Sequence, residues 1–351
     1  MSEATISEPL TRARAHIERG EFEAAEVELI KAMASGTLKE RLGESLYLIA
    51  VAQRYQRKLE HAGKTLRELL ELEPDNARAW QERGHVCLSE NDLERARTAY
   101  EQAVRRNPAL VASWKALVNL YRMGGLEEER AMAEQEAVYL DSLPEPLLGV
   151  LSLCNEGKLF KADQLCRHFL REHQQHVEGM RLLAMIGEQL GVLMDAEFLL
   201  ETALEIAPDY TRLRYDYANL LLKMQKFERA REETQALVTT APDSLRYLAL
   251  HANALAGVGE HEAAIAAYSE VIDSRPGQFV LHVMRGHAEK TIGRLDRAVS
   301  SYRTACELQP LYGDAYWSLA NTKTYRFATD EIERMRRAEA DARIGVDDRI
   351  H

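Results

Sequence analysis

Cysteine and histidine are the residues of this 351-residue chain most able to bind a metal or react with a substrate. The cysteines are not paired at C-x-x-C spacing, and they fall at or beside helical packing positions, where small buried hydrophobic residues are expected. They are Cys87, Cys154, Cys166 and Cys306. The histidines that come closest to a cluster, His168, His173 and His176, have no further ligand type at metal spacing. We therefore expect no metal site.

Motifs that bind phosphates or catalyse hydrolysis are absent from the sequence. It has no G-x-x-x-x-G-K loop, no G-x-G-x-x-G after a strand and no H-E-x-x-H. The formal net charge of -11 disfavours a nucleic-acid partner, because phosphate binding needs a basic surface. No apolar run approaches the roughly 20 residues of a membrane span, and the first residues lack the apolar core of a signal peptide. We expect a cytoplasmic chain without catalytic residues, cofactor or membrane contact.

What the sequence does contain is a repeated packing pattern, which is clearest in residues 77–110. Counting Ala77 as position 1, small residues stand at positions 8 and 20, bulky ones at 4, 17 and 24, and a proline at 32. The matching residues are Trp80, Gly84, Leu93, Ala96, Tyr100, Ala103 and Pro108. This spacing resembles the 34-residue tetratricopeptide repeat (TPR), in which two antiparallel helices pack closely through the small residues.

Copies of this unit fill most of the chain, because one hairpin cannot bury its apolar stripe alone. We number repeats 1 to 9 as residues 6–39, 43–76, 77–110, 111–142, 143–176, 177–210, 211–244, 245–278 and 279–312. The sequence thus predicts an all-α, right-handed solenoid with almost no strand. Three segments are expected: residues 1–142, where repeat 4 is degenerate, the regular repeats of 143–312, and a junction at 313–351.

Repeat 4 is the irregular copy. Its second helix is expected to dissolve within LEEERAMAEQEAVYLDSLPEP, residues 126–146. Two residues are missing before the pattern resumes at Leu143, and Pro144 and Pro146 interrupt the next helix near its start. The stacking of the repeats is therefore predicted to change across Leu143.

The first helices of TPR proteins line a concave wall, and repeat positions 2, 5, 9, 12 and 13 face it. In residues 177–321 these positions form a mildly basic set with several asparagines, opposed by Glu178 and Glu188. The set is Arg181, Arg212, Tyr215, Asn219, Lys223, Arg246, Asn253, His287, Lys290, Trp317 and Asn321. Asparagine amides can hold a peptide backbone, and arginine favours acidic partners. We predict a groove for an acidic protein or peptide segment; the alternative is an inert, solvated scaffold.

The last part of the chain departs from the repeat pattern. The string AYWSLANTKTYRF (residues 315–327), followed by DEIERM and DDRIH, resembles the junction in bacterial TPR-containing sulfotransferases. That resemblance implies an array that recruits a protein acceptor to a later domain, where 3'-phosphoadenosine 5'-phosphosulfate would bind. We expect this chain to be the non-catalytic TPR region of such a protein, ending before any catalytic element. The alternatives are a stand-alone adaptor that organises a complex, or the array of another transferase, such as a glycosyltransferase.

Trp317 sets the register of the final, partial repeat. If Ala320 takes the small position 8, Tyr316 is the buried aromatic residue and Trp317 lies on the groove side. The opposite register would place Asn321 at the close-contact position, where its amide would need buried partners. The first register is therefore predicted. Trp317 then has two possible covers, a lid formed by the residues after the turn or the surface of a further domain.

Overall fold

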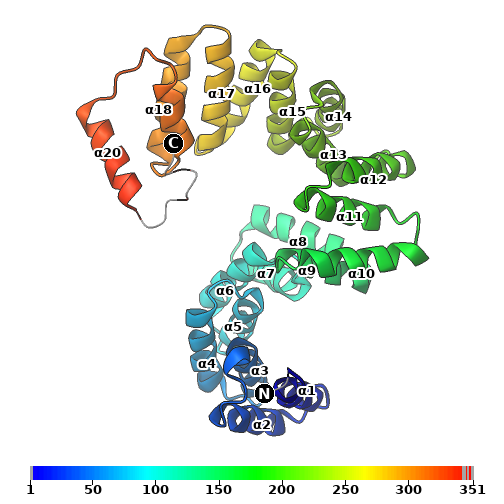
Figure 1. Ribbon diagram of the computed structural model, residues 1–351. Coiled ribbons are helices and arrows are strands. Elements are labelled where there is room, and N and C mark those ends of the chain that lie inside the picture. Colours follow the sequence, from blue (N-terminus) through cyan, green and yellow to red (C-terminus); the bar gives the residue numbers. More distant parts are fainter. Residues whose placement is uncertain (1–2, 342–344, 346–347, 349–351) are drawn as a thin grey trace. The chain divides into compact units, whose positions relative to one another are not determined.

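The computed structural model describes residues 3–341, 345 and 348, with side chains from Glu8 onward. All regular structure in this part of the chain is helical (Figure 1). The helices divide into two compact units, Met1–Phe169 and Leu170–His351, and each unit is described by itself. No helix of the described residues is long and apolar enough to cross a membrane.

Unit 1 contains the helices of repeats 1 to 4, the first helix of repeat 5 and most of its second helix. They are α1 (Glu3–Glu18), α2 (Phe22–Ala34), the short 3-10 helix η1 (Lys39–Arg41), α3 (Leu42–Tyr55), α4 (Leu59–Leu72), α5 (Ala77–Ser89), α6 (Leu93–Arg106), α7 (Val111–Met123), α8 (Glu127–Asp141), α9 (Glu145–Asn155) and α10 (Leu159–Glu172). The last three residues of α10 lie in unit 2.

Unit 2 contains repeats 6 to 9 and two further helices. They are α11 (Val177–Gln189), α12 (Leu193–Ile206), α13 (Thr211–Lys223), α14 (Phe227–Thr240), α15 (Leu245–Gly257), α16 (His261–Ser274), α17 (Phe279–Thr291), α18 (Leu295–Leu308), α19 (Gly313–Ala320) and α20 (Thr329–Ala340). Every predicted repeat therefore supplies one helix pair, and the all-α repeat architecture is confirmed.

The turn inside each hairpin explains why glycine recurs at repeat position 15. Gly191, Gly259 and Gly293 adopt φ values of 79°, 88° and 78°, a left-handed conformation that glycine adopts without a Cβ clash. Repeat 3 places Asn91 there and repeat 7 places Gln225, with φ of 61° and 58°. The backbone geometry of the turn is thus kept even where the sequence lacks glycine.

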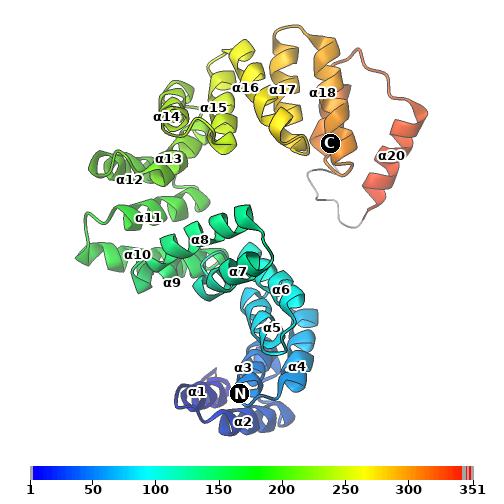
Figure 2. The ribbon, with the colours of Figure 1, turned by 180° about the vertical axis from the view of Figure 1, so that it is seen from behind.

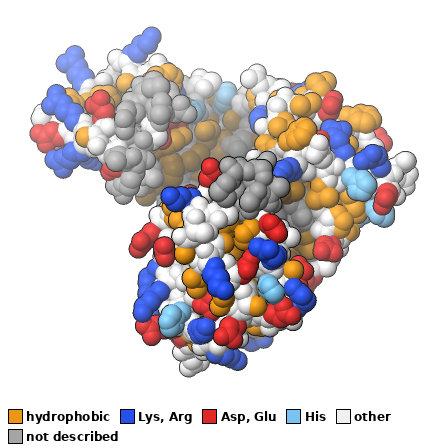
Figure 3. Space-filling view, turned by 60° about the horizontal axis from the view of Figure 1, so that its bottom comes forward, with side chains coloured by type: hydrophobic (Ala, Val, Ile, Leu, Met, Phe, Trp, Pro, Cys, Tyr) orange, Lys and Arg blue, Asp and Glu red, His pale blue; other side chains and the backbone are white. Residues whose placement is uncertain are grey.

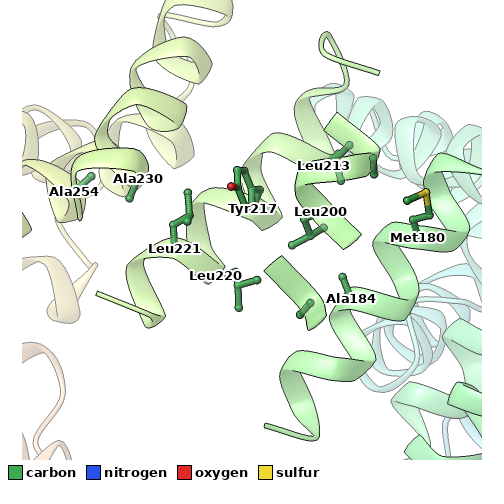
Figure 4. Close-up of a cluster of buried hydrophobic side chains, with 11 residues drawn as sticks. Met180, Ala184, Leu200, Leu213, Tyr217, Leu220, Leu221, Ala230 and Ala254 are labelled. Carbon is green, nitrogen blue, oxygen red and sulfur yellow. The ribbon is translucent and has the colours of Figure 1, made fainter. Parts of the chain in front are cut away.

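The core of unit 2 lies between consecutive helices rather than in one central mass. Leu213, Tyr217 and Leu221 are spaced by four residues along α13, so they share one face and pack between the neighbouring helices (Figure 4). Alanines at the small repeat positions, such as Ala184 and Ala230, are completely buried. They allow the helices to approach closely, which is the packing that the repeat pattern predicts.

Repeat 4 corrects one expectation: its second helix does not dissolve. Helix α8 runs over 15 residues and buries Ala133, Ala137 and Leu140. These are repeat positions 23, 27 and 30, whereas α6 buries positions 20, 23, 24, 27 and 28. The apolar face has moved along the helix by about one turn, so the expected small residue at position 20 is replaced by Arg130 while the helix remains.

The two prolines after α8 begin the next helix. Pro144 is the N-cap of α9 and Pro146 stands in its first turn, where a missing backbone N–H costs no helical hydrogen bond. As a result α9 is 11 residues long, two fewer than α7. The predicted change in stacking across Leu143 and the segment boundaries at 142 and 312 remain predictions, because the two compact units are defined by contacts and not by repeat regularity.

The end of unit 2 confirms the predicted register and corrects one detail of it. Tyr316 is buried, whereas Trp317 is 45% exposed. Ala320, expected at a close-contact position, is exposed because α19 ends there and no regular second helix covers it. Instead Tyr325, Phe327 and Met335 pack against the buried cluster that contains Tyr316. Helix α20, which carries Met335, lies next to α18 at the end of unit 2 (Figure 2). Of the DDRIH string only Asp348 is described, and its Oδ1 accepts a hydrogen bond from the Gly313 backbone N–H at 3.0 Å.

Candidate partner-binding groove

The first helices of unit 2 form a continuous wall. Helix α11 contacts α13, α13 contacts α15, and α15 contacts α17, in addition to the contacts within each hairpin. Side chains at the same repeat position on these helices therefore come from adjacent elements of one wall. This arrangement holds all the predicted groove residues except Trp317 and Asn321, which lie on α19 and at its end.

Arg181 is not a groove residue that a partner can reach. Its side chain is only 6% exposed and its guanidinium donates to both carboxylate oxygens of Glu178 at 2.6 to 3.0 Å. It also pairs with Asp216 on the next first helix, and the Tyr210 hydroxyl donates to Glu178 at 2.8 Å. Breaking such a buried ion pair is costly, so Arg181 connects repeats 6 and 7 structurally.

In three repeats the side chain at position 9 contacts a tyrosine hydroxyl of the same repeat. In repeat 8 the Tyr268 hydroxyl donates to Asn253 Oδ1 at 2.7 Å, and in repeat 9 the Tyr302 hydroxyl lies 2.9 Å from His287 Nδ1. Repeat 3 has the same pair, with 2.6 Å between Tyr100 and His85. Each tyrosine stands at position 24 of the second helix. The side chain at position 9 therefore satisfies a buried hydroxyl, which a partner would have to displace.

Repeat 7 is different, because its position 24 is Thr234. The Thr234 hydroxyl donates to the Ala230 carbonyl at 2.8 Å and lies 2.9 Å from His251. No tyrosine of this repeat reaches Asn219, whose Nδ2 donates to the Tyr215 carbonyl of its own helix at 2.8 Å. Asn219 is half-buried, and its carbonyl oxygen has no partner among the described residues.

Beside Asn219, a small aromatic and basic cluster lies on α13 and α15. The Arg246 guanidinium lies 3.8 Å from the centre of the Tyr215 ring, and the Tyr215 and Tyr247 rings are 5.9 Å apart. Arg246 is exposed and forms no ion pair within the described part of the chain. The stacking fixes the plane of the guanidinium and leaves its N–H donors at the edge. We call Tyr215, Arg246 and Tyr247 the stacked cluster. Arg212 holds the same repeat position as Arg246, one repeat earlier, and is half-buried.

The remaining predicted residues are partly engaged. Lys223 pairs with Glu188 at 3.1 Å on the surface. Lys290 donates to the Asn321 carbonyl at 3.1 Å, so these two residues are brought together and join α17 to the end of α19. Trp317 follows the buried Tyr316 in the sequence, and its side chain is partly exposed to solvent. Of the eleven predicted residues, the structure therefore assigns a clear packing role to Arg181, Asn253 and His287.

Burial determines the protonation of the groups behind the wall. Burial lowers the pKa of His287 and of His251 below their usual 6.5 and raises the pKa of Tyr302 and Tyr268 above their usual 10. These side chains are consequently neutral at pH 7. The positive charge of the wall comes from arginine and lysine alone.

Burial also sets the protonation of two of the cysteines in the described residues. Burial raises the pKa of Cys154 to about 11 and that of Cys306 to about 12, so both are thiols at neutral pH. No group of three His, Cys, Asp or Glu side chains is placed to hold a metal ion within the described ranges.

Unit 1 contains a cavity of about 980 Å³. Its lining mixes basic and acidic side chains more evenly than the first-helix wall of unit 2 does. Arg106 pairs with Asp75 at 3.2 Å, and Glu156 pairs with Lys158 at 2.6 Å and lies 3.7 Å from Arg78. Figure 3 shows the same mixture of basic and acidic side chains over the face in view. Because these charges neutralise each other, the cavity indicates no preference for a charged ligand.

Comparison with known proteins identifies the repeats. Family models described as tetratricopeptide repeat match residues 47–141, 193–254 and 280–310. The chain contains tetratricopeptide repeats. Among solved structures, MamA from Desulfovibrio magneticus RS-1 is 19% identical with a TM-score of 0.44, over 47% of this chain and 93% of that one. A tetratricopeptide repeat protein from Parabacteroides merdae is 16% identical with a TM-score of 0.39, over 92% of this chain and 100% of that one.

The sequence prediction of TPR groove residues missed two features. Tyr247 belongs to the stacked cluster but stands at position 3, which the groove rule omits. The engagement of position 9 by the tyrosine at position 24 was also not predicted. The signal was present in the sequence, because the three repeats with tyrosine at position 24 carry histidine or asparagine at position 9.

Proposed function

We propose that this TPR array is a protein-interaction scaffold and that unit 2 holds an extended acidic segment of its partner. The observation that carries the proposal is Arg246, an exposed guanidinium stacked on Tyr215 at 3.8 Å without a carboxylate partner in the described chain. A carboxylate can accept two parallel hydrogen bonds from the edge of the guanidinium while the stack stays intact. Asn219, one turn along α13 from Tyr215, would pair with the backbone of the bound segment.

The experiment uses a fluorescein-labelled decapeptide of alternating glutamate and glycine, with a glutamine version as its uncharged counterpart. Fluorescence anisotropy should show tighter binding of the glutamate peptide to residues 1–351. Arg246→Ala should raise Kd at least fivefold. Arg246→Lys should give a Kd between those of the wild type and Arg246→Ala, because lysine keeps the charge but loses the planar fork. Arg275→Ala is the matched control: it removes the same charge from the exposed loop before α17. Equal losses for Arg246→Ala and Arg275→Ala would refute the proposal.

We propose further, on the resemblance of residues 315–327, that the array delivers a protein acceptor to a sulfate-transferring domain encoded after His351. In that arrangement the sulfate donor binds the later domain and no cofactor binds residues 1–351. Sequencing the gene beyond the codon for His351 tests this. A strand followed by a phosphate-binding loop would support it, whereas a stop codon or a glycosyltransferase domain would overturn it in favour of an adaptor or another transferase.

A further inference from the structure

Most second helices of the array carry an acidic residue at repeat position 18, in their first turn, whereas repeats 5 and 6 place the exposed apolar residues Phe160 and Met194 there. At position 18, seven of the nine repeats have Glu or Asp: Glu23, Glu60, Glu94, Glu128, Glu228, Glu262 and Asp296. A negative side chain there is favourable because it interacts with the helix dipole. Repeat 6 places Met194 at this position and leaves it 66% exposed. Asp195, one residue later, keeps a negative charge in this turn, while Met194 exposes apolar area to water.

Met194 is part of a larger apolar surface in unit 2. Phe198, one turn later on α12, is 68% exposed, whereas repeat 7 has Glu232 at the same position. The turn before α12 adds Leu190 and Val192, which are 49% and 45% exposed. We call Leu190, Val192, Met194 and Phe198 the outer patch. Four large apolar side chains exposed over a hairpin turn and the first turns of one helix are characteristic of an interaction surface.

Acidic side chains without partners border the outer patch. Asp195, next to Met194, and Glu205, in the last turn of α12, are both exposed and form no ion pair with the described residues. Glu201 between them is paired with Arg229 at 2.7 Å. From Met194 to Glu205 the helix rises about 16 Å, which equals three helical turns. A partner of complementary chemistry therefore presents apolar side chains flanked by lysine or arginine over a similar length.

We propose that the outer patch binds a basic amphipathic helix of a partner protein. Its apolar residues, spaced at i, i+3 or i+4 and i+7, cover Met194 and Phe198, and its basic residues pair with Asp195 and Glu205. The patch lies on a second helix and its preceding turn, whereas the stacked cluster lies on first helices. The array thus binds two partners of opposite charge at separate surfaces.

The test uses a probe of defined chemistry: a fluorescein-labelled 14-residue helix of leucine and lysine with one apolar face, and an isomer of the same composition without that face. The key variant is Met194→Glu with Phe198→Glu, which gives repeat 6 the residues of repeat 7 and so leaves the fold intact. This variant adds two negative charges. Nonspecific attraction of a cationic peptide would therefore grow stronger, whereas loss of a specific apolar contact weakens binding.

We expect the amphipathic probe to bind the wild-type chain at least tenfold tighter than its isomer, and the double variant to lose that preference. Asp195→Asn with Glu205→Gln should weaken binding severalfold at low salt and less at high salt. Leu308→Glu, at an exposed position of repeat 9, is the control and should leave Kd unchanged. Equal or tighter binding by the double variant would overturn the proposal. So would sedimentation showing a wild-type dimer and a monomeric double variant, because the occupant would then be a second copy of this chain.

Discussion

Repeats 7 and 8 carry an asparagine at the same groove position and use it in opposite ways. Asn253 accepts a hydrogen bond from the buried Tyr268 hydroxyl at 2.7 Å, whereas Asn219 donates to the carbonyl of Tyr215 on its own helix at 2.8 Å. The difference comes from position 24 of the second helix, which is tyrosine in repeat 8 and threonine in repeat 7. A polar residue on the first-helix wall can thus be structural or available, and a residue 15 positions later determines which it is.

Gly286→Ala should have the largest effect, because it moves the tyrosine on which the position 9 contact depends. A Cβ at Gly286 would lie 2.5 Å from the Tyr302 ring, which is fully buried. We expect a loss of about 1 to 3 kcal/mol in the free energy of unfolding, the usual cost of overpacking. Urea denaturation measures it. The control is Ala252→Gly in repeat 8, where alanine and tyrosine already coexist; a loss from Gly286→Ala no larger than the control would contradict the packing role of Tyr302.

Asn253→Ala should come next, with a loss of about 1 to 2 kcal/mol, because the buried Tyr268 hydroxyl is left without an acceptor. Replacing both partners, as Asn253→Ala with Tyr268→Phe, should recover much of that loss, since no donor then remains unsatisfied. Thermal melting of the two single variants and the double variant gives the coupling energy. Additive losses would show that the 2.7 Å contact is not an energetic pair.

The sequence predicted the fold well because the repeat signal comes from packing, and packing recurs. Seven repeats have alanine or glycine at both positions 8 and 20, the 34-residue spacing located the other two, and the structure contains a hairpin at all nine. Helix α8 shows the limit: without a small residue at position 20, the pattern predicted that the second helix of repeat 4 would dissolve, although Ala133, Ala137 and Leu140 still form one apolar face. The pattern tests fixed positions, whereas a helix needs only some buried face.

The binding residues were harder to predict for a related reason. The groove rule identifies which positions lie on the first-helix wall, but Arg181, Asn253 and His287 are engaged by Glu178, Tyr268 and Tyr302. These contacts are made by residues from another helix or another turn. A rule for single positions cannot include them, although the pairing of positions 9 and 24 was visible once the repeats were compared.

The position 9 contact in repeat 9 should also make stability depend on pH. Burial lowers the pKa of His287 below 6.5, so the unfolded chain binds a proton more readily than the folded chain does. Stability is therefore unaffected by this residue above about pH 6.5 and falls as pH drops through and below that value. His287→Asn, which copies Asn253, should keep the Tyr302 contact and reduce the loss of stability between pH 7 and 5.5. Identical pH profiles for variant and wild type would contradict this.

Asn219→Ala should have the smallest effect on folding, within about 0.5 kcal/mol, because it removes only a contact to its own helix and leaves no buried group unsatisfied. Its effect should appear in binding, as a higher Kd for the glutamate decapeptide. Chemical denaturation and anisotropy on the same preparation separate the two readouts. A loss of stability as large as that of Asn253→Ala would remove the distinction between the two repeats.

The most direct test of this distinction is a titration followed by nitrogen and proton NMR. With the glutamate decapeptide added to labelled chain, the side-chain resonances of Arg246 Nε and Asn219 Nδ2 should shift, while those of Asn253 Nδ2 and Arg181 Nε stay in place. This result would show that the available side chains bind and the engaged ones support the fold. Shifts at Asn253 and Arg181 with none at Arg246 would contradict the account.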